Sequence, residues 1–321
     1  MKKVLFATTA LIATAGMAAA DVTLGGTGRI GLNYSGGVPA GVDKVRFEKR
    51  ITLNLDGSGE TDGGLSFGGR IRLRSNEGDA GLAGAAGNVY IGNDMWRVTV
   101  GNTDGAMLNR ISYFQGSVGL TGIGYRNMSS NIGGTSGVDR WAVNTFASNG
   151  NAGQVVRVDF NLGDFGVSLS SDFRGSNVLA AVNHEDSLAV SYNLGDWNLA
   201  AGYATNVDAG GGIVGIRDMF SASVNGTIGD FGVGIQASDL ENTALKVVVH
   251  GSYDFGDTTV TAWVADTNWD TPAAMAAGLA TEETEYGIGF KHSLGGATLA
   301  GGIVRDFQGN TNADLGVRFS F

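Results

Sequence analysis

The residues with the clearest capacity for chemistry are arginines at alternate positions in the first quarter of the chain. Arg70, Arg72 and Arg74 alternate with apolar residues, and Arg46 and Arg50 follow the same pattern on an earlier segment. Alternate residues of a β-strand point to one face, so these segments would carry a row of guanidinium groups on one side. The predicted basic wall consists of Arg29, Arg46, Arg50, Arg70, Arg72, Arg74 and Arg97.

A row of like charges has an electrostatic cost. Two such charges about 6 Å apart in water repel by roughly 0.7 kcal/mol, so their repetition on neighbouring strands suggests a use. Such a basic wall, facing acidic residues on the opposite side, would create an electric field across the water between them. A solvated charged face without such a role is the alternative.

Groups for bond-breaking chemistry are scarce. His184 falls in a predicted loop, His250 on the inward face and His292 on the outward face of predicted strands, so they share no site. Cysteine and His-Glu-x-x-His are missing from the sequence. We therefore predict no catalytic residue, no metal site and no cofactor. The acid-rich segment 254–270 could hold calcium, but solvated acids are the favoured interpretation.

Alternation of apolar and polar residues with period two dominates the chain and predicts β-strands. It is clearest in residues 22–34, 45–55, 65–74, 156–162, 188–194 and 315–321. Many runs reach nine residues or more, the length at which a tilted strand crosses a bilayer, whereas strands of soluble sandwiches usually have about five or six. The pattern therefore favours a transmembrane β-barrel with apolar residues facing lipid.

The connections between these segments alternate between short and long. The short ones are Gly163-Asp164, Gly195-Asp196, Gly229-Asp230, Gly256-Asp257 and Gly295-Gly296. These dipeptides suit two-residue hairpin turns, which favour glycine where φ is positive. Longer polar connections, such as residues 174–185, 206–218 and 266–283, lie between them. Short turns at one rim and long loops at the other are typical of a membrane barrel.

Aromatic residues follow three of the short turns directly. Phe165, Trp197 and Phe231 would lie at one height, as in half of an aromatic girdle at a membrane interface. Phe321 at the end of an alternating segment is assigned to the same group. Aromatic residues that merely close hairpin ends are the alternative.

The strand count predicts the architecture. Five strands are expected from Val22 to about Asn102 and eleven from Gln154 to Phe321, which gives sixteen, an even number as a single-chain barrel requires. We predict an all-β fold, a transmembrane antiparallel β-barrel of 16 strands, with residues 21–321 as one domain. The intervening segment 103–153 is too long for an ordinary loop and needs a function of its own.

The start of the chain and its composition agree with export. Lys2 and Lys3 precede an apolar stretch and Ala18-Ala19-Ala20, the order of a secretory signal peptide, predicted to be residues 1–20 and removed. Without these two lysines, 19 basic residues remain against 31 acidic ones, a net charge of −12 that disfavours nucleic acid as a partner. The 54 glycines, with only 2 prolines, suit turns and crowded strand faces rather than collagen.

Together these features resemble the bacterial general porins, specifically the sixteen-stranded Rhodobacter-type porins of alphaproteobacteria. The resemblance lies in the mature start 21–26, the segment 119–125, the Gly-Asp-aromatic hairpins and the ending 314–321, in that order along the chain. It implies location in the outer membrane of a Gram-negative bacterium, a homotrimer among outer-membrane lipids and a water-filled pore in each subunit. It also implies that segment 103–153 folds into the barrel and narrows the pore, and that terminal Phe321 serves as an assembly signal.

The expected pore loop departs from the family, whose loop is usually rich in acids facing the arginines. The residues singled out in this loop are Asp104, Arg110, Tyr113, Phe114, Arg126, Asp139 and Arg140. Only two of them are acidic, so we expect the constriction to be weakly selective or anion-preferring despite the net charge. Tyr113 and Phe114 could lie at the constriction or pack the loop against the wall.

The predicted function is passive diffusion of small hydrophilic solutes and ions through the outer membrane. Two alternatives stay open: a surface adhesin or structural barrel with a plugged lumen, and an outer-membrane barrel hydrolase, whose triad residues need no fixed sequence spacing.

Lys49 bears on oligomerisation, because its position in the alternating pattern places it on the outward face, among Phe47 and Ile51. A lipid-facing lysine at mid-depth costs about 2–4 kcal/mol, so it should lie near a rim or beneath a neighbouring subunit.

Overall fold

The computed structural model describes residues 21–79, 83–84, 87–113, 118–132, 146, 154–172, 184–208, 216–277 and 280–321. The predicted signal peptide lies outside the described residues. The strands are β1 (Asp21–Ser35), β2 (Val45–Glu60), β3 (Ser66–Asn76), β4 (Ala83–Gly84), β5 (Asn88–Gly92), β6 (Trp96–Gly101), β7 (Val155–Leu162), β8 (Phe165–Asp172), β9 (Asp186–Leu194), β10 (Trp197–Asp208), β11 (Ile216–Ile228), β12 (Phe231–Leu240), β13 (Ala244–Asp254), β14 (Thr258–Trp269), β15 (Thr284–Ser293), β16 (Ala297–Arg305) and β17 (Thr311–Ser320). The helical turns are α1 (Ala106–Arg110), η1 (Ile123–Tyr125) and α2 (Pro272–Ala277).

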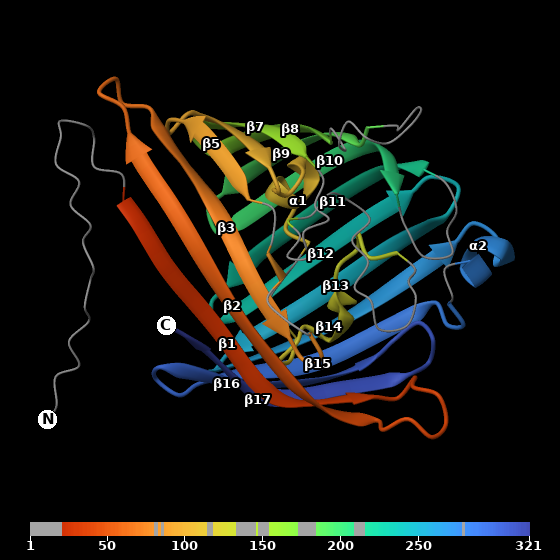
Figure 1. Ribbon diagram of the computed structural model, residues 1–321. Helices are drawn as coiled ribbons and strands as arrows, with labels where there is room; N and C mark the ends of the chain where they lie inside the picture. The colour runs from red at the N-terminus through yellow and green to blue at the C-terminus, as the bar shows by residue number, and fades with distance from the viewer. Residues whose placement is uncertain are drawn as a thin grey trace, which may run out of the picture.

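The strands form one closed antiparallel sheet (Figure 1). Neighbours in sequence are neighbours in the sheet, and β17 returns to pair with β1, with Arg29 opposite Arg318. The short β4 and β5 both pair with β3, so they are two pieces of one strand. Counted this way, the described residues form sixteen strands, five before the long segment and eleven after it. The predicted barrel is confirmed, because the pairing of β17 with β1 closes the sheet on itself.

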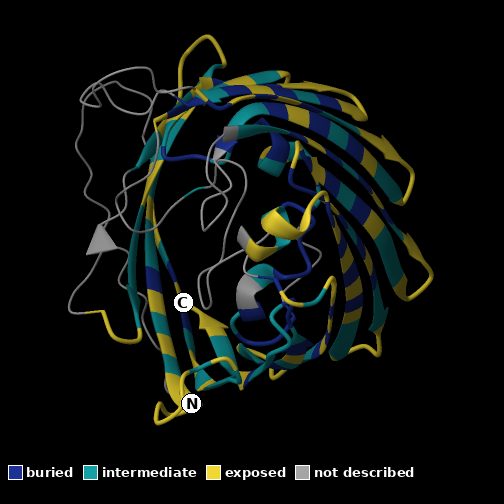
Figure 2. Cartoon of the chain, turned by 90° about the vertical axis from the view of Figure 1, so that its right-hand side faces the viewer, coloured by how far each residue is buried: buried dark blue, intermediate teal, exposed yellow. Residues whose placement is uncertain are grey.

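The outer face of the barrel is a continuous apolar surface. Outward side chains such as Val22, Leu24 and Phe47 are 69%, 71% and 76% exposed. Exposed and covered residues alternate along many of the strands, most clearly in β8, β13, β14 and β15 (Figure 2). An apolar surface of this extent is typical of a protein that faces lipid rather than water. Within the part of the chain that the structure describes, no helix is long and apolar enough to span a membrane.

Glycine allows the tight turns at one rim. Gly163, Gly195 and Gly229 have φ values of 62°, 59° and 60°, and each is the first of two residues between paired strands. A positive φ at the first central position is the pattern of a type II′ turn, whose twist matches that of the strands it joins. The predicted two-residue turns are therefore present, and we call this end of the barrel the short-turn rim.

Glycine also accommodates aromatic rings on the outer face where the barrel closes. The backbone of Phe321 exchanges hydrogen bonds of 2.8 and 3.0 Å with Gly26. A β-carbon at Gly26 would lie 2.3 Å from the Phe321 ring, and one at Gly28 would lie 2.5 Å from the Phe319 ring. The two glycines therefore occupy the apolar phase of β1 because the rings of the last strand cover them.

The largest buried core lies inside the barrel. Segments of the long loop, including α1, pack against the inward faces of β9 to β14, and Figure 1 shows α1 inside the barrel. The core contains Met107, Ile111, Tyr113 and Met128 from the loop, and its wall residues include Ala204, Met219 and Leu240. In this half of the barrel the loop, rather than water, fills the interior.

Candidate functional site

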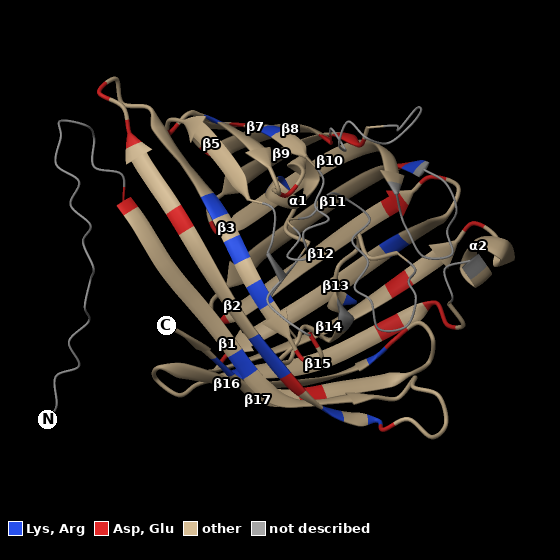
Figure 3. Cartoon of the chain, viewed as in Figure 1, with Lys and Arg blue, Asp and Glu red and all other residues tan. Residues whose placement is uncertain are grey.

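The opposite half of the barrel carries the arginines. Arg29 on β1 lies directly across from Arg318 on β17 and from Arg50 on β2. Arg74 on β3 lies across from Thr52 of β2. Directly opposed residues on antiparallel strands have Cα atoms about 4.5–5.5 Å apart, so the row crosses four neighbouring strands (Figure 3).

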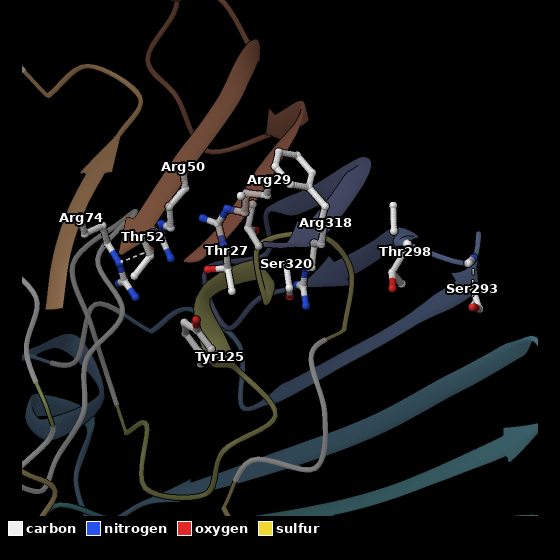
Figure 4. Close-up of a pocket in the computed structure, with 16 residues that line it drawn as sticks. Thr27, Arg29, Arg50, Thr52, Arg74, Tyr125, Ser293, Thr298, Arg318 and Ser320 are labelled. Carbon is white, nitrogen blue, oxygen red and sulfur yellow. Dashed lines mark hydrogen bonds between the residues drawn. The ribbon is translucent and has the colours of Figure 1, made fainter. Parts of the chain in front are cut away.

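These four arginines line a cavity of about 650 Å³ (Figure 4). The cavity extends to Gly295 and Gly296 at the short-turn rim, and we call it the short-turn vestibule. Its other polar lining residues are hydroxyl-bearing: Thr27, Thr52, Thr121, Tyr125, Ser293, Thr298 and Ser320. None of the described residues that line it is acidic.

A second cavity, of about 340 Å³, lies toward the other rim and is called the long-loop vestibule. Arg46 and Arg126 contribute basic groups to its lining, and Glu48 and Asp306 contribute acidic ones. The two vestibules share a set of lining residues, namely Arg29, Arg50 and Thr121. The two vestibules therefore adjoin between the arginine row and the loop, and we call this region the passage.

Two charged residues of β17 hold the loop at this passage. The carboxylate of Asp314 accepts hydrogen bonds from the backbone N–H of Leu120 at 2.7 Å and from the N–H and hydroxyl of Thr121, both at 2.6 Å. Arg318 donates to the carbonyl oxygens of Leu120 and of Gly119, the latter at 2.7 Å. This pair therefore fixes the height at which Thr121 and the nearby Tyr125 face the arginines.

A recess of inward glycines lets the loop backbone approach the wall. A β-carbon at Gly31 would lie 2.5 Å from the Leu120 side chain, and one at Gly302 would lie 3.0 Å from Gly119. Gly289 and Gly316 are blocked by the same loop segment. Larger residues at these positions would push the loop toward the arginines and close the passage.

A second set of contacts fastens the loop to the packed half. Lys246 is fully buried and donates to Glu285 at 2.7 Å and to the carbonyls of Arg126 and Asn131, both at 3.0 Å. The Arg126 guanidinium lies 3.8 Å from Glu285. A buried ion pair of this kind offsets the cost of its desolvation only when further hydrogen bonds satisfy both partners.

Gln236 on β12 supplies further hydrogen bonds to the loop. Its amide accepts from the N–H of Ser129 at 3.0 Å and donates to the carbonyls of Tyr113 and Asn127 at 2.9 and 3.0 Å. The residue is 1% exposed. These bonds satisfy loop backbone groups that have lost water on entering the barrel.

The predicted wall arginines take different partners. Arg70 pairs with Asp56 at 2.5 Å, and Arg97 lies over the Tyr90 ring at 4.4 Å. Arg72 lies over the Phe146 ring at 3.9 Å. Only Arg29, Arg50 and Arg74 of the predicted set line the short-turn vestibule, and Arg46 lines the long-loop vestibule with the first two.

Most described residues predicted for the pore loop do not face the passage. Arg110 donates to Ser168 at 2.7 Å and to two strand carbonyls, and desolvation by burial lowers the pKa of its guanidinium. Tyr113 is 1% exposed within the inner core, and burial raises the pKa of its phenol above the usual range. Asp104 accepts from the backbone of Phe146 at 2.7 Å. Arg126 alone among them lines a vestibule.

Three predicted loop residues, Phe114, Asp139 and Arg140, lie outside the described residues. Sequence reasoning also missed Arg318, Thr121 and Tyr125. A signal for Arg318 was present, since it lies in the polar phase of the last strand, which closes onto β1 beside Arg29. Thr121 and Tyr125 lie in a segment without periodic alternation, so their positions at the vestibule follow only from the docking of the loop.

The predicted interfacial aromatics gather at the short-turn rim. Phe165, Trp197 and Phe231 each begin the strand after a two-residue turn. Phe231 packs against Tyr253 with ring centroids 4.4 Å apart, and the exposed Phe321 ring lies at the same end of the barrel beside Phe319. Their role in the membrane interface remains a proposal.

In the described part of the chain, no cluster of three or more His, Cys, Asp or Glu could hold a metal ion.

A closed barrel with an apolar outer belt and a charged internal passage defines the class of the molecule as a membrane pore. The chain belongs to the family of Gram-negative porins, whose model matches residues 7–312. It is 28% identical to a porin of Fuscovulum blasticum, over 94% of this chain and 100% of that protein.

Solved structures agree with this assignment. Two engineered variants of the Rhodopseudomonas blastica porin superpose with a TM-score of 0.77, at 25% and 26% identity, over 94% of this chain and 100% of theirs. The expected resemblance to Rhodobacter-type porins is confirmed. The protein is a passive diffusion channel for small hydrophilic solutes and ions in the outer membrane of a Gram-negative bacterium.

Proposed function

We propose that solutes cross this channel at the passage between the arginine row and the loop, and that the passage favours anions. The observation that carries the proposal is the lining of the short-turn vestibule by Arg29, Arg50, Arg74 and Arg318. Charges that line a pore set its selectivity. The acids of this chain lie largely elsewhere, at turns such as Asp164 and Asp196 or in pairs such as Asp56 with Arg70.

The local charge balance supports this sign of selectivity. Glu48 neutralises Arg29 at 2.5 Å, and it lines the long-loop vestibule rather than the other one. Asp314 accepts hydrogen bonds from loop N–H groups, which stabilise its charge where it holds the loop. An anion entering from the short-turn rim therefore meets more guanidinium groups than carboxylates.

We further propose that residues 103–153 act as one pore-constricting loop within a single domain of residues 21–321. The described parts, 103–113 and 118–132, are held by the contacts of Asp314, Gln236 and Lys246. The backbone of Phe146 also contacts Asp104 and Arg72. These contacts support a loop that narrows the lumen without plugging it, because both vestibules remain open beside it.

A homotrimer is proposed for the assembly. Lys49 lies exposed on the outer face of β2, where it donates a hydrogen bond to Ser75 at 3.4 Å. Its neighbours Phe47 and Ile51 are 76% and 41% exposed. A subunit that covers this surface would shield the lysine from lipid, and the mass of the detergent-extracted protein tests this proposal. A dissociated single subunit under mild extraction would contradict it.

The protein acts as a channel without catalytic chemistry in this proposal, since no arrangement of described residues favours a barrel hydrolase. The test of the pore assignment is the reversal potential of purified protein in a planar bilayer under a tenfold KCl gradient. We expect stable conductance steps and a reversal potential with the sign of chloride preference. Marked potassium preference at neutral pH would refute the selectivity proposal, and silence would favour a plugged barrel.

A further inference from the structure

The residues that line the short-turn vestibule are suited to binding an anion, and not only to creating an electric field across a pore. Its basic groups come from four consecutive strands of the closed sheet, β17, β1, β2 and β3, and they converge on one cavity (Figure 4). Hydroxyl groups from the wall and the loop, among them Thr27, Thr298, Ser320 and Tyr125, surround them. Guanidinium and hydroxyl groups are both hydrogen-bond donors, and together they suit an oxyanion.

Glu48 neutralises Arg29, whereas the described contacts of Arg50, Arg74 and Arg318 include hydrogen bonds to neutral groups. Arg50 donates through Nε to Asn76 at 2.6 Å, and Arg74 donates through Nε to Thr52 at 3.2 Å. Arg318 donates to loop carbonyls. Such contacts fix the orientation of a guanidinium without cancelling its charge, so the row is pre-organised and positive.

We infer that the short-turn vestibule is a saturable binding site for a dianionic phosphate group, either free or carried by a small organic solute. The planar fork of arginine matches two oxygens of a phosphate, and the dianion is attracted more strongly than chloride by several guanidinium groups together. The inference deepens the proposed anion preference and rests on it. A cavity of about 650 Å³ is in the range that holds small organic ligands, so it leaves space beyond a bound phosphate.

The experiment is a titration of chloride current through the reconstituted full-length mature protein. Inorganic phosphate or glycerol phosphate is added on one side at pH 8, with constant ionic strength kept by sulfate-free salts. We expect each to reduce the chloride current along a saturation curve, with half-block on the order of 1–10 mM, the affinity of a weak specific site. A lower half-blocking concentration for glycerol phosphate assigns the site to organic phosphates, and equal values assign it to the phosphate group alone.

Two matched variants locate the site. Arg74→Gln removes a vestibule arginine whose hydrogen bond among the described residues goes to Thr52 of the barrel wall. We expect it to raise the half-blocking concentration about tenfold, since one bond to a charged group is lost. Arg97→Gln removes the same charge from an arginine outside the vestibule that stacks on Tyr90, and we expect less than a twofold change. Heat-modifiable gel mobility checks that both variants fold, and Arg50→Gln replaces Arg74→Gln if that barrel does not assemble.

The pH dependence supplies an independent readout. The second ionisation of a phosphate monoester has a pKa of about 6, so the block should weaken several-fold between pH 8 and pH 5.5 as the dianion is lost. Chloride preference combined with no saturable block would overturn the site but leave the proposed selectivity standing. Equal loss of block in Arg74→Gln and Arg97→Gln would also overturn it, because it would indicate a general charge effect. Potassium preference would instead refute the proposed function itself.

Discussion

The two halves of the barrel interior share one backbone architecture and differ in what fills them. On β17, β1, β2 and β3 the inward positions carry arginines, and cavities remain open before them. On β8 to β12 the inward positions carry small residues such as Ser170, Ala189, Ala204 and Ser238, each at most 8% exposed beneath the loop. Small side chains leave room for a docked segment, whereas long charged ones hold it away. The position of the pore therefore follows from the distribution of side-chain size around the barrel.

The buried ion pair is the place where the packed half can be broken most severely. Lys246→Met would leave Glu285 without its nearest cation, and removal of one partner of a buried pair costs about 3–5 kcal/mol. Urea unfolding in lipid vesicles would measure the loss. Lys44→Met, at an exposed loop position, is the control and should change little.

The double variant Lys246→Met with Glu285→Gln sharpens this prediction. It removes both charges, so it should recover part of the lost stability, because the penalty arises from an uncompensated charge. Stability that falls further in the double variant would contradict the assigned pairing.

The inner apolar core predicts the next largest effect. Met107→Ala should destabilise the protein by about 2–3 kcal/mol, because Met107 is 1% exposed among loop and wall residues and its removal leaves a cavity. The same unfolding measurement applies. Met95→Ala, where the side chain is 57% exposed, should be nearly neutral, and an equal loss in both would show that the loop does not pack a core.

The open half should respond in selectivity rather than in stability. Arg50→Gln removes a charge that lines both vestibules, and we expect the chloride-to-potassium permeability ratio to fall about threefold, as for the loss of ~0.7 kcal/mol of interaction. Stability should change by less than about 0.5 kcal/mol. Reversal potentials and unfolding curves of the same preparation check both, and unchanged selectivity would remove Arg50 from the passage.

A change in salt concentration should have the smallest effect of these tests, and it also distinguishes the open half of the barrel from the packed half. Raising KCl from 0.1 to 1 M shortens the Debye length from about 10 to 3 Å, so the anion preference of the open half should decline toward unity. The buried pair of the packed half is shielded from salt, and the unfolding midpoint should move little. A preference that stays constant over this range would argue against the arginine charges as its cause.

The sequence predicts the barrel well because period-two alternation, strand length and glycine turns are local properties. The strand count, the short turns and the inward phase of Arg70, Arg72 and Arg74 all follow from these patterns. The sequence predicts only part of the arginine row. Arg318 and Arg29 become neighbours only when the last strand pairs with the first.

The docking of the loop was the part that sequence could not supply. Tyr113 and Arg110 are polar residues in a segment without period, and both turn to the wall rather than to the passage. The signal that could have located the docking surface is the run of inward serines and alanines on β8 to β12. Its meaning depends on a partner segment far away in the chain, which periodicity does not report.

The division of the interior is the central claim, and thiol accessibility tests it most directly because the chain contains no cysteine. Thr27→Cys places a thiol at an exposed position in the short-turn vestibule, and Ala204→Cys places one at a fully buried inward position in the packed half. A small anionic thiol reagent added to open channels in a planar bilayer should react quickly with the first and reduce its conductance. The second should stay unmodified, with constant conductance. Equally rapid modification and block of Ala204→Cys would show that solutes also pass through the half assigned to the loop, and would contradict the account.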